Sequence, residues 1–121
     1  GAFGYKQEHS TFMSQNNITA DVLEDTKYDV VFGSQTINLS NAITDGGVYN
    51  IECNAVFGSA KIIIPKNIKV KIKSASVFGS VKTPHNETNF GSSEDNYGPQ
   101  NGGQINLKVN AVFGSAIIYE N

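Results

Sequence analysis

The sequence predicts an all-β fold, a β-solenoid or single-stranded β-helix-like domain in which each rung turns a corner at the same short motif. The tetrapeptide Val-Phe-Gly-Ser occurs four times in 121 residues, which indicates a chain built from repeated structural units. On both sides of each copy, apolar residues alternate with other residues, as in a strand with one buried face. An antiparallel β-sandwich, with Phe-Gly as a recurring bulge, is the alternative that the same pattern allows.

The four copies of the motif stand at irregular intervals along the chain. Successive Phe residues are 25, 21 and 35 positions apart, and periods of roughly 20–50 residues are typical of solenoids. Identical corners are easiest to explain if they lie above one another in a stack. The residues of this structural motif are Phe32, Gly33, Ser34, Phe57, Gly58, Ser59, Phe78, Gly79, Ser80, Phe113, Gly114 and Ser115.

The alternation of apolar residues changes its parity at each motif. Before Phe57, Ile51 and Cys53 share the parity of the Phe, whereas Ile62 and Ile64 after it have the opposite parity. Since a shift of one residue turns side chains to the other face of a sheet, the chain must bend at the motif. Gly permits the unusual backbone angles or the close approach that such a corner needs. We therefore expect strand, corner, strand in each repeat, with the four Phe residues in an internal, offset-stacked ladder at about 4.8 Å spacing.

The whole chain, residues 1–121, is expected to be a single β-repeat domain. Its repeats occupy residues 28–81 and 104–119. Residues 1–27 are expected to be a degenerate capping segment, in which Thr11-Phe12-Met13-Ser14 stands for the motif and Met13 replaces Gly.

A polar insertion at residues 82–104 separates the third and fourth repeats. It has no apolar periodicity, and long segments of this kind are usually functional or disordered. We expect disorder here. Phe90 and Tyr97 could anchor the insertion to the body of the domain or contact a partner.

Composition limits the kinds of partner. The net charge is −2 and the charged residues form no block, which argues against nucleic acid and anionic lipid surfaces as electrostatic partners. No apolar run approaches the roughly 20 residues that span a bilayer. The single Cys excludes an intramolecular disulfide.

The sequence shows no catalytic or metal-binding constellation. His9 and His85 are isolated from each other and from the single Cys, without metal-ligand spacing. Cys53 has the inward parity of a small buried apolar residue. The Gly-Ser pairs lack the context of a nucleophile elbow, and four equivalent nucleophiles would serve no reaction. We expect neither an enzyme nor a cofactor.

The stretch from the second to the third motif resembles a known family. Residues 54–59 read Asn-Ala-Val-Phe-Gly-Ser, residues 60–65 read Ala-Lys-Ile-Ile-Ile-Pro, and residues 68–80 end in a further Val-Phe-Gly-Ser. This resembles the C-terminal domain of LiaF-like, cell-wall-active-antibiotics response proteins of bacteria, which repeats a Val-Phe-Gly-(Asp/Ser/Gly) element with a Pro-containing turn between the second and third copies. The resemblance implies a regulatory module of the cell envelope, attached to the membrane through segments outside this chain. The best-known members restrain a membrane sensor kinase, and the family pattern contains no catalytic residues.

Three functions follow as hypotheses. The first is a regulatory domain that binds a protein partner, such as a membrane sensor kinase, through a face of the solenoid or through the insertion. The second is a self-assembling structural or adhesin-like β-solenoid, which would pair with another copy through exposed end rungs. The third is a binder of a small ligand or carbohydrate.

Overall fold

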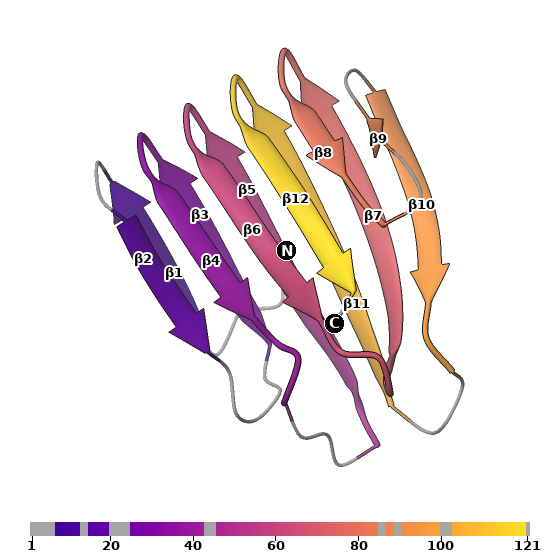
Figure 1. Ribbon diagram of the computed structural model, residues 1–121. Coiled ribbons are helices and arrows are strands. Elements are labelled where there is room, and N and C mark those ends of the chain that lie inside the picture. Colours follow the sequence, from indigo (N-terminus) through magenta and orange to yellow (C-terminus); the bar gives the residue numbers. More distant parts are fainter. Residues whose placement is uncertain are drawn as a thin grey trace.

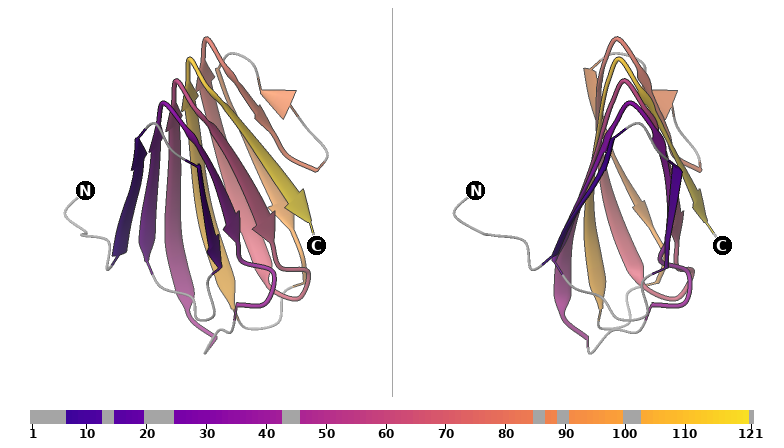
Figure 2. Two further views of the ribbon diagram at one scale, coloured as in Figure 1. Left: turned by 60° about the vertical axis from the view of Figure 1, so that its left-hand side comes forward. Right: turned by 90° about the vertical axis from the view of Figure 1, so that its left-hand side faces the viewer.

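The computed structural model describes residues 7–12, 15–19, 25–42, 46–84, 87–88, 91–99 and 103–120. The described chain consists of strands and connections arranged as two facing sheets (Figure 1). The sheets converge where the corners lie and diverge toward the opposite end, so the domain is a wedge (Figure 2). The expected all-β, solenoid-like architecture is confirmed.

Each sheet has six strands, and we call them sheet A and sheet B. The spatial order of sheet A is β1 (Gln7–Phe12), β3 (Thr26–Val31), β5 (Val48–Val56), β11 (Gln104–Val112), β7 (Lys69–Val77) and β10 (Gly91–Tyr97). The order of sheet B is β2 (Gln15–Thr19), β4 (Ser34–Asn38), β6 (Ser59–Ile64), β12 (Ser115–Glu120), β8 (Ser80–Lys82) and β9 (Glu87–Thr88).

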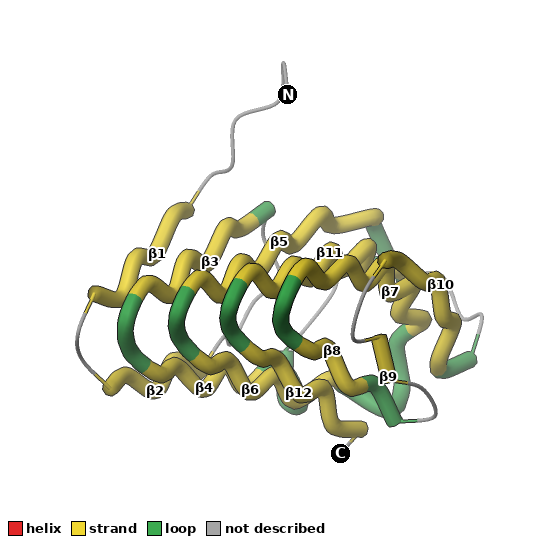
Figure 3. Tube along the Cα trace, turned by 90° about the horizontal axis from the view of Figure 1, so that it is seen from above, coloured by secondary structure: helices red, strands yellow, loops and turns green. Residues whose placement is uncertain are grey.

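The repeated motifs lie in register, one above the next. Each repeat places one strand in sheet A and one in sheet B, and neighbouring repeats pair in parallel. The Val of one motif therefore stands beside the Val of the next, in the order Val31, Val56, Val112 and Val77. Seen from above, the corners form a single row (Figure 3).

The spatial order of the repeats differs from their order in the sequence. The fourth repeat, β11 and β12, lies between the second and the third, because β11 pairs with β5 on one side and with β7 on the other. In a solenoid whose rungs stack in the order of the sequence, the fourth repeat would lie at the end of the stack. The chain reaches this position after passing through β9 and β10, at the far end of the two sheets.

The core lies between the sheets and follows the alternation expected from the sequence. In β5, β7 and β11, buried residues alternate with more exposed ones, and in β4 and β6 the buried set has the opposite parity relative to the motif. The largest fully buried apolar side chains are Ile37, Leu39, Ile62, Ile64, Ile72, Ile105, Leu107, Ile118, Val30, Val70 and Val81.

The insertion contains ordered structure, so the expected disorder is wrong for its described part. Strand β10 pairs antiparallel with β7 over its whole length, and Lys71 Nζ lies 3.4 Å from Glu94 Oε1 across the pair. Strand β10 thus supplies hydrogen-bonding partners for the backbone amides and carbonyls on the otherwise open edge of β7. The polar sequence of the insertion has no apolar alternation that would have indicated this strand. Within the insertion, residues 85, 86, 89, 90 and 100–102 lie outside the described residues.

Strands β1 and β2 add a further rung at the other end, within the residues that we expect to be a capping segment. Its register is shifted by one residue from our expectation. Phe12 pairs with Val31 and Gln15 with Ser34, so Phe12 is equivalent to the Val of the motif and not to the Phe. The corner itself, at residues 13–14, lies outside the described residues.

In the described parts of the chain, we find no helix of a length and apolarity that would allow it to cross a membrane.

Candidate functional site

The corners share an unusual backbone conformation. Phe32, Phe57, Phe78 and Phe113 have φ values of 56°, 54°, 56° and 53°. This is the left-handed region, which costs a residue other than Gly about 1–2 kcal/mol. One residue in that region turns the chain sharply. As a result, the buried residues have the parity of the Phe before the corner and the opposite parity after it.

Backbone hydrogen bonds join each corner to its neighbours. The amide of Phe32 donates to the carbonyl oxygen of Val56 at 3.2 Å, and the amide of Ser59 donates back to that of Gly33 at 2.9 Å. The same reciprocal pair joins the second repeat to the fourth, and the fourth to the third. The corner is therefore a continuous hydrogen-bonded stack, which offsets the strain that each Phe carries.

The Gly of the motif is required by close approach and not by its own φ. A Cβ on Gly58 would lie 2.7 Å from the carbonyl oxygen of Gly33, and one on Gly114 would lie 2.6 Å from that of Gly58. These contacts are with backbone, which cannot rotate away. Of the two roles that the sequence allowed for Gly, the structure assigns the close approach.

The four Phe rings form a stacked ladder on the outside of the wedge. Centroids of neighbouring rings are 5.1 Å apart, with interplanar angles of 4°, 3° and 10° along the spatial order Phe32, Phe57, Phe113, Phe78. The expected stacking is confirmed, but the expectation that the ladder is internal is wrong. The rings are 49%, 51%, 52% and 70% exposed in the same order. The left-handed φ turns each ring outward although its parity matches that of the core residues before it.

A second apolar row runs beside the rings. The outward-facing Val residues of the motifs stand side by side at the ends of β3, β5, β11 and β7, and Val77 and Val112 are exposed. We call the two rows together the corner ridge: Phe32, Phe57, Phe113, Phe78, Val31, Val56, Val112 and Val77. It is the edge along which the two sheets converge (Figure 2).

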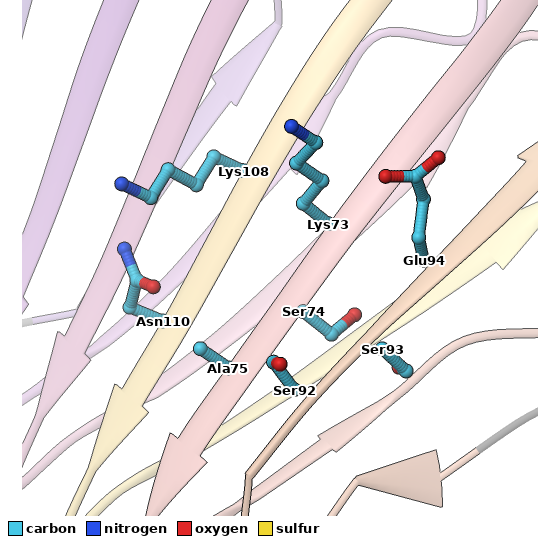
Figure 4. A pocket seen from close by; sticks show the side chains of 8 residues that line it. All are labelled: Lys73, Ser74, Ala75, Ser92, Ser93, Glu94, Lys108 and Asn110. Atoms are coloured by element: carbon cyan, nitrogen blue, oxygen red, sulfur yellow. The ribbon is translucent and has the colours of Figure 1, made fainter.

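A hollow of about 390 Å³ lies on sheet A, where β10 runs beside β7. Figure 4 shows side chains from three strands around it. Lys108 and Asn110 come from β11, Lys73 and Ala75 from β7, and Ser92 and Glu94 from β10; Ser74 and Ser93 complete the lining.

The Lys side chains around the hollow differ from their neighbour Lys71 in that they lack an ion pair among the described residues. Lys108 stands directly beside Lys73 in the register of β11 and β7, and like charges in that position destabilise a sheet. Glu52 lies on the other side of Lys108 and Glu94 on the other side of Lys73, but Glu94 forms its ion pair with Lys71, and in the described parts of the chain neither Lys73 nor Lys108 forms one. Both Lys residues are exposed. An acidic group brought to this surface would relieve their repulsion.

Several Asn side chains on sheet A form hydrogen bonds between neighbouring strands. Asn110 Nδ2 donates to Asn54 Oδ1 at 2.7 Å, and Asn54 Nδ2 donates to Asp29 Oδ1 at 2.8 Å. A second Asn–Asn hydrogen bond runs from Asn106 Nδ2 to Asn50 Oδ1 at 3.1 Å. This side of the sheet is therefore held by a polar network, and the hollow lies at its end.

The structure places the single Cys, Cys53, in the core. Cys53 is fully buried, as expected, and burial raises the pKa of its thiol to about 12, so the reactive thiolate is not formed near neutral pH. Among the described residues, no three His, Cys, Asp or Glu side chains cluster in a way that could hold a metal ion. His85 and the side chain of His9 lie outside the described parts.

Of the two aromatic residues that the sequence singled out in the insertion, the structure describes Tyr97. Tyr97 is only 6% exposed and its hydroxyl donates to Thr83 Oγ1 at 3.1 Å. This burial and this hydrogen bond favour the first of the two alternatives for Tyr97, an anchor of the insertion to the body of the domain, over a partner contact. Phe90 lies outside the described residues, and its role stays a prediction.

Sequence reasoning missed the hollow. Its lining comes from three strands that the chain order separates, and β10 carried no apolar alternation by which to recognise it. The neighbouring Lys residues of β7 were visible in the sequence, but their position beside Lys108 depends on the placement of the fourth repeat.

The comparisons with known proteins agree with this architecture. A family profile described as "Cell wall-active antibiotics response LiaF, C-terminal" matches residues 12–118. Among solved structures, the chain is similar to a candidate cell adhesion protein from Clostridium sporogenes ATCC 15579, with a TM-score of 0.57, 12% identity and coverage of 95% of this chain and 92% of that one. At that identity the likeness concerns the fold alone. No curated protein matches this sequence significantly.

Proposed function

Because this chain belongs to the family of LiaF-like C-terminal domains of cell wall-active antibiotics response proteins, we propose that it is a regulatory domain that acts by binding a protein partner. The family is regulatory and not catalytic, and its members are associated with the membrane of the cell envelope. Within that role, the domain is a non-enzymatic contact module, and a membrane sensor kinase is the kind of partner that the resemblance implies.

The observation that carries the proposal is the hollow on sheet A. It offers two unpaired Lys ammonium groups, Lys73 and Lys108, next to the amide of Asn110 and the small side chains of Ala75 and Ser92. The one carboxylate that lines it, Glu94, is paired with Lys71. This arrangement suits an acidic side chain of a protein partner, with Asn110 and Ser92 available for hydrogen bonds around it. The partner we propose therefore carries an acidic residue at the centre of its contact surface.

The test is a pull-down with single substitutions that leave the strands in place. Ser92→Trp fills the hollow, and Lys108→Glu reverses one of its charges; both positions are exposed. Lys66→Glu, in the exposed turn after Pro65, is the matched charge-reversal control. The unaltered domain and the control should recover the same envelope protein from detergent-solubilised membranes of the source organism. The two hollow variants should not, and the loss should repeat with the purified pair.

Equal recovery by all four proteins would contradict the hollow as the contact. Replacement of the whole insertion is a poor test, because Tyr97 belongs to the core and β10 completes the edge of β7.

Self-assembly is a second candidate, favoured by one observation. Strand β1 is the last strand of sheet A in the described chain, so one edge of it has no partner strand there. A second copy could pair at this edge. Sedimentation velocity over a range of concentrations distinguishes the two, since self-assembly predicts a sedimentation coefficient that rises with concentration.

A further inference from the structure

The two ends of the wedge differ in how their last strands pair. Figure 3 shows β1 and β2 at one end and β9 and β10 at the other. Strands β1 and β2 continue the parallel pairing of the repeats, whereas β10 and β9 run antiparallel to their neighbours β7 and β8. Of the two described ends, only the β1–β2 end therefore keeps the regular geometry of a rung.

The β10–β9 end carries features by which proteins protect the edges of their sheets. Its strand in sheet B, β9, has only two residues. On β10, Glu94 is charged and exposed. Asp95 lies on the same face of β10 as the buried Tyr97, and its carboxylate accepts a hydrogen bond from Thr83 Oγ1 at 3.3 Å. Very short strands, charged side chains and inward-facing charges all oppose the addition of a further strand.

The β1–β2 end lacks these features in its described strands. The strands are six and five residues long, with the sequences Gln-Glu-His-Ser-Thr-Phe and Gln-Asn-Asn-Ile-Thr. They contain one carboxylate, Glu8, and neither Lys, Arg nor Pro. No described strand pairs with their outer edges, so the backbone presents two open rows of hydrogen-bonding groups. We propose that this end pairs with the same end of a second copy, which gives a closed dimer with two-fold symmetry.

The wedge shape selects one arrangement of the two copies. Strand β1 runs toward the corner and β2 runs away from it (Figure 1). A two-fold axis that runs from the corners to the base of the wedge places β1 of each copy beside β2 of the other. These strands are then antiparallel, and the narrow sides of both wedges lie together (Figure 2). Pairing of β1 with β1 would instead place the narrow side of one wedge beside the wide side of the other. Because a two-fold interface uses the same surface on both copies, the assembly closes at two.

The distance from the corner determines which residues stand opposite one another. Phe12, the last residue of β1, stands opposite Gln15, the first residue of β2 in the second copy. Each step away from the corner adds one residue on both strands, so Ser10 is opposite Asn17. Glu8, the single carboxylate of the two strands, is opposite a Thr. The pairing therefore brings no like charges directly opposite one another.

The proposed dimer rests on self-assembly, the second candidate function, and does not involve the hollow. The hollow is lined by residues of β11, β7 and β10, at the opposite end of sheet A from β1. A dimer of this kind carries one hollow at each end of the joined sheets.

Charge substitutions at opposed positions test the pairing and its register. Ser10 and Asn17 stand beside Asp29 and Thr36, which alternate with the buried residues of their strands, so substitutions there leave the core positions unchanged. Ser10→Lys with Asn17→Lys brings two pairs of like charges together in the dimer. Ser10→Lys with Asn17→Glu brings two pairs of opposite charges together. Asn96→Lys, at an exposed position of β10, is the control at the other end.

Sedimentation velocity from micromolar to millimolar concentration measures the state of each protein. The unaltered domain and Asn96→Lys should pass from monomer to dimer with the same dissociation constant, and no larger species should form. Lys at both positions should raise that constant at least about tenfold relative to the Lys–Glu protein, because opposed like charges weaken strand pairing and opposite charges favour it. Thermal unfolding followed by circular dichroism establishes that each variant is folded.

The other outcomes overturn the dimer in distinguishable ways. If the unaltered domain stays monomeric over the whole range, self-assembly fails together with the dimer. If species larger than a dimer form, or the Lys–Lys and Lys–Glu proteins dissociate alike, self-assembly stands and the two-fold pairing of β1 with β2 is wrong. Lys108→Glu, which should abolish recovery of the protein partner, should dimerise like the unaltered domain, so a failure of the hollow is told apart from a failure of the dimer.

Discussion

Substitution of Phe57 tests the conformation and the exposure of the corner together. Its ring is 51% exposed, and full burial of a Phe side chain contributes at most about 3 kcal/mol, so burial contributes about 1–1.5 kcal/mol here. Stacking against Phe32 and Phe113 adds about 0.5–1 kcal/mol. Phe57→Ala should therefore cost about 2 kcal/mol, below the roughly 3–5 kcal/mol that a fully buried Phe would cost.

The comparison of Ala with Gly at the same position is more decisive. In a strand, Gly is usually less favourable than Ala by about 0.5–1 kcal/mol. At φ 54° Ala retains a left-handed strain of about 1–2 kcal/mol, which Gly does not carry. Phe57→Gly should therefore be more stable than Phe57→Ala by about 0.5–1 kcal/mol, the reverse of the usual order.

Urea unfolding of the two variants and of the unaltered domain measures these differences, provided that the dependence on urea stays the same. Ala55→Gly, two residues earlier in a fully buried strand position, is the control in which Gly must be the less stable residue. If Phe57→Ala is the more stable of the two variants at position 57, the left-handed corner is wrong. A loss above about 3 kcal/mol in both would mean that the ring is buried after all.

Further substitutions test the close packing and the buried polar groups. Gly114→Ala places a Cβ 2.6 Å from the carbonyl oxygen of Gly58 and 2.9 Å from that of Ala55, so we expect a loss above about 2 kcal/mol in urea unfolding; a loss below about 0.5 kcal/mol would contradict the tight corner. Both amide atoms of Gln35 are buried without a hydrogen-bond partner in the described chain, so Gln35→Leu should raise stability by about 1–3 kcal/mol, and a decrease would show that the amide has a partner. Burial raises the pKa of the Cys53 thiol from 9.0 to about 12, and the nearby charges of Asp29 and Glu52 add to the shift. The unfolded chain releases this proton above about pH 9, whereas the folded chain keeps it, so the free energy of unfolding should fall as the pH rises from 9 toward 12. Cys53→Ala should make that fall less steep. An identical dependence of the free energy of unfolding on pH in both proteins would refute the shift.

Much of the architecture was readable from particular residues. The alternation of Ile51, Cys53 and Ala55 indicated a strand with one buried face, and all three are buried. The change of parity after Phe57 indicated a corner, and Ile62 is buried on the far side of it. These inferences succeeded because burial along a strand depends on the local period of two, which the sequence displays directly.

The direction of the Phe rings was not readable in the same way. Parity placed Phe57 with the core, since a strand continued through it would point it inward. A single left-handed φ at that residue turns the ring out, and no neighbouring residue type signals this choice. Gly58 suggested where the strain would be, but the positive φ belongs to the residue before it.

The sequence by itself determined that the chain is a set of strand–corner–strand units with one apolar face each, because the period of two and the repeated motif are local properties. Only the tertiary structure decided how those units are ordered and what they expose. The fourth repeat lies between the second and third because β11 pairs with both β5 and β7, and a pairing between distant strands leaves no mark on either sequence. The same placement sets Lys108 beside Lys73 and extends the row of exposed Phe rings without a gap. The hollow and the corner ridge therefore both arise from contacts between residues that lie far apart in the chain.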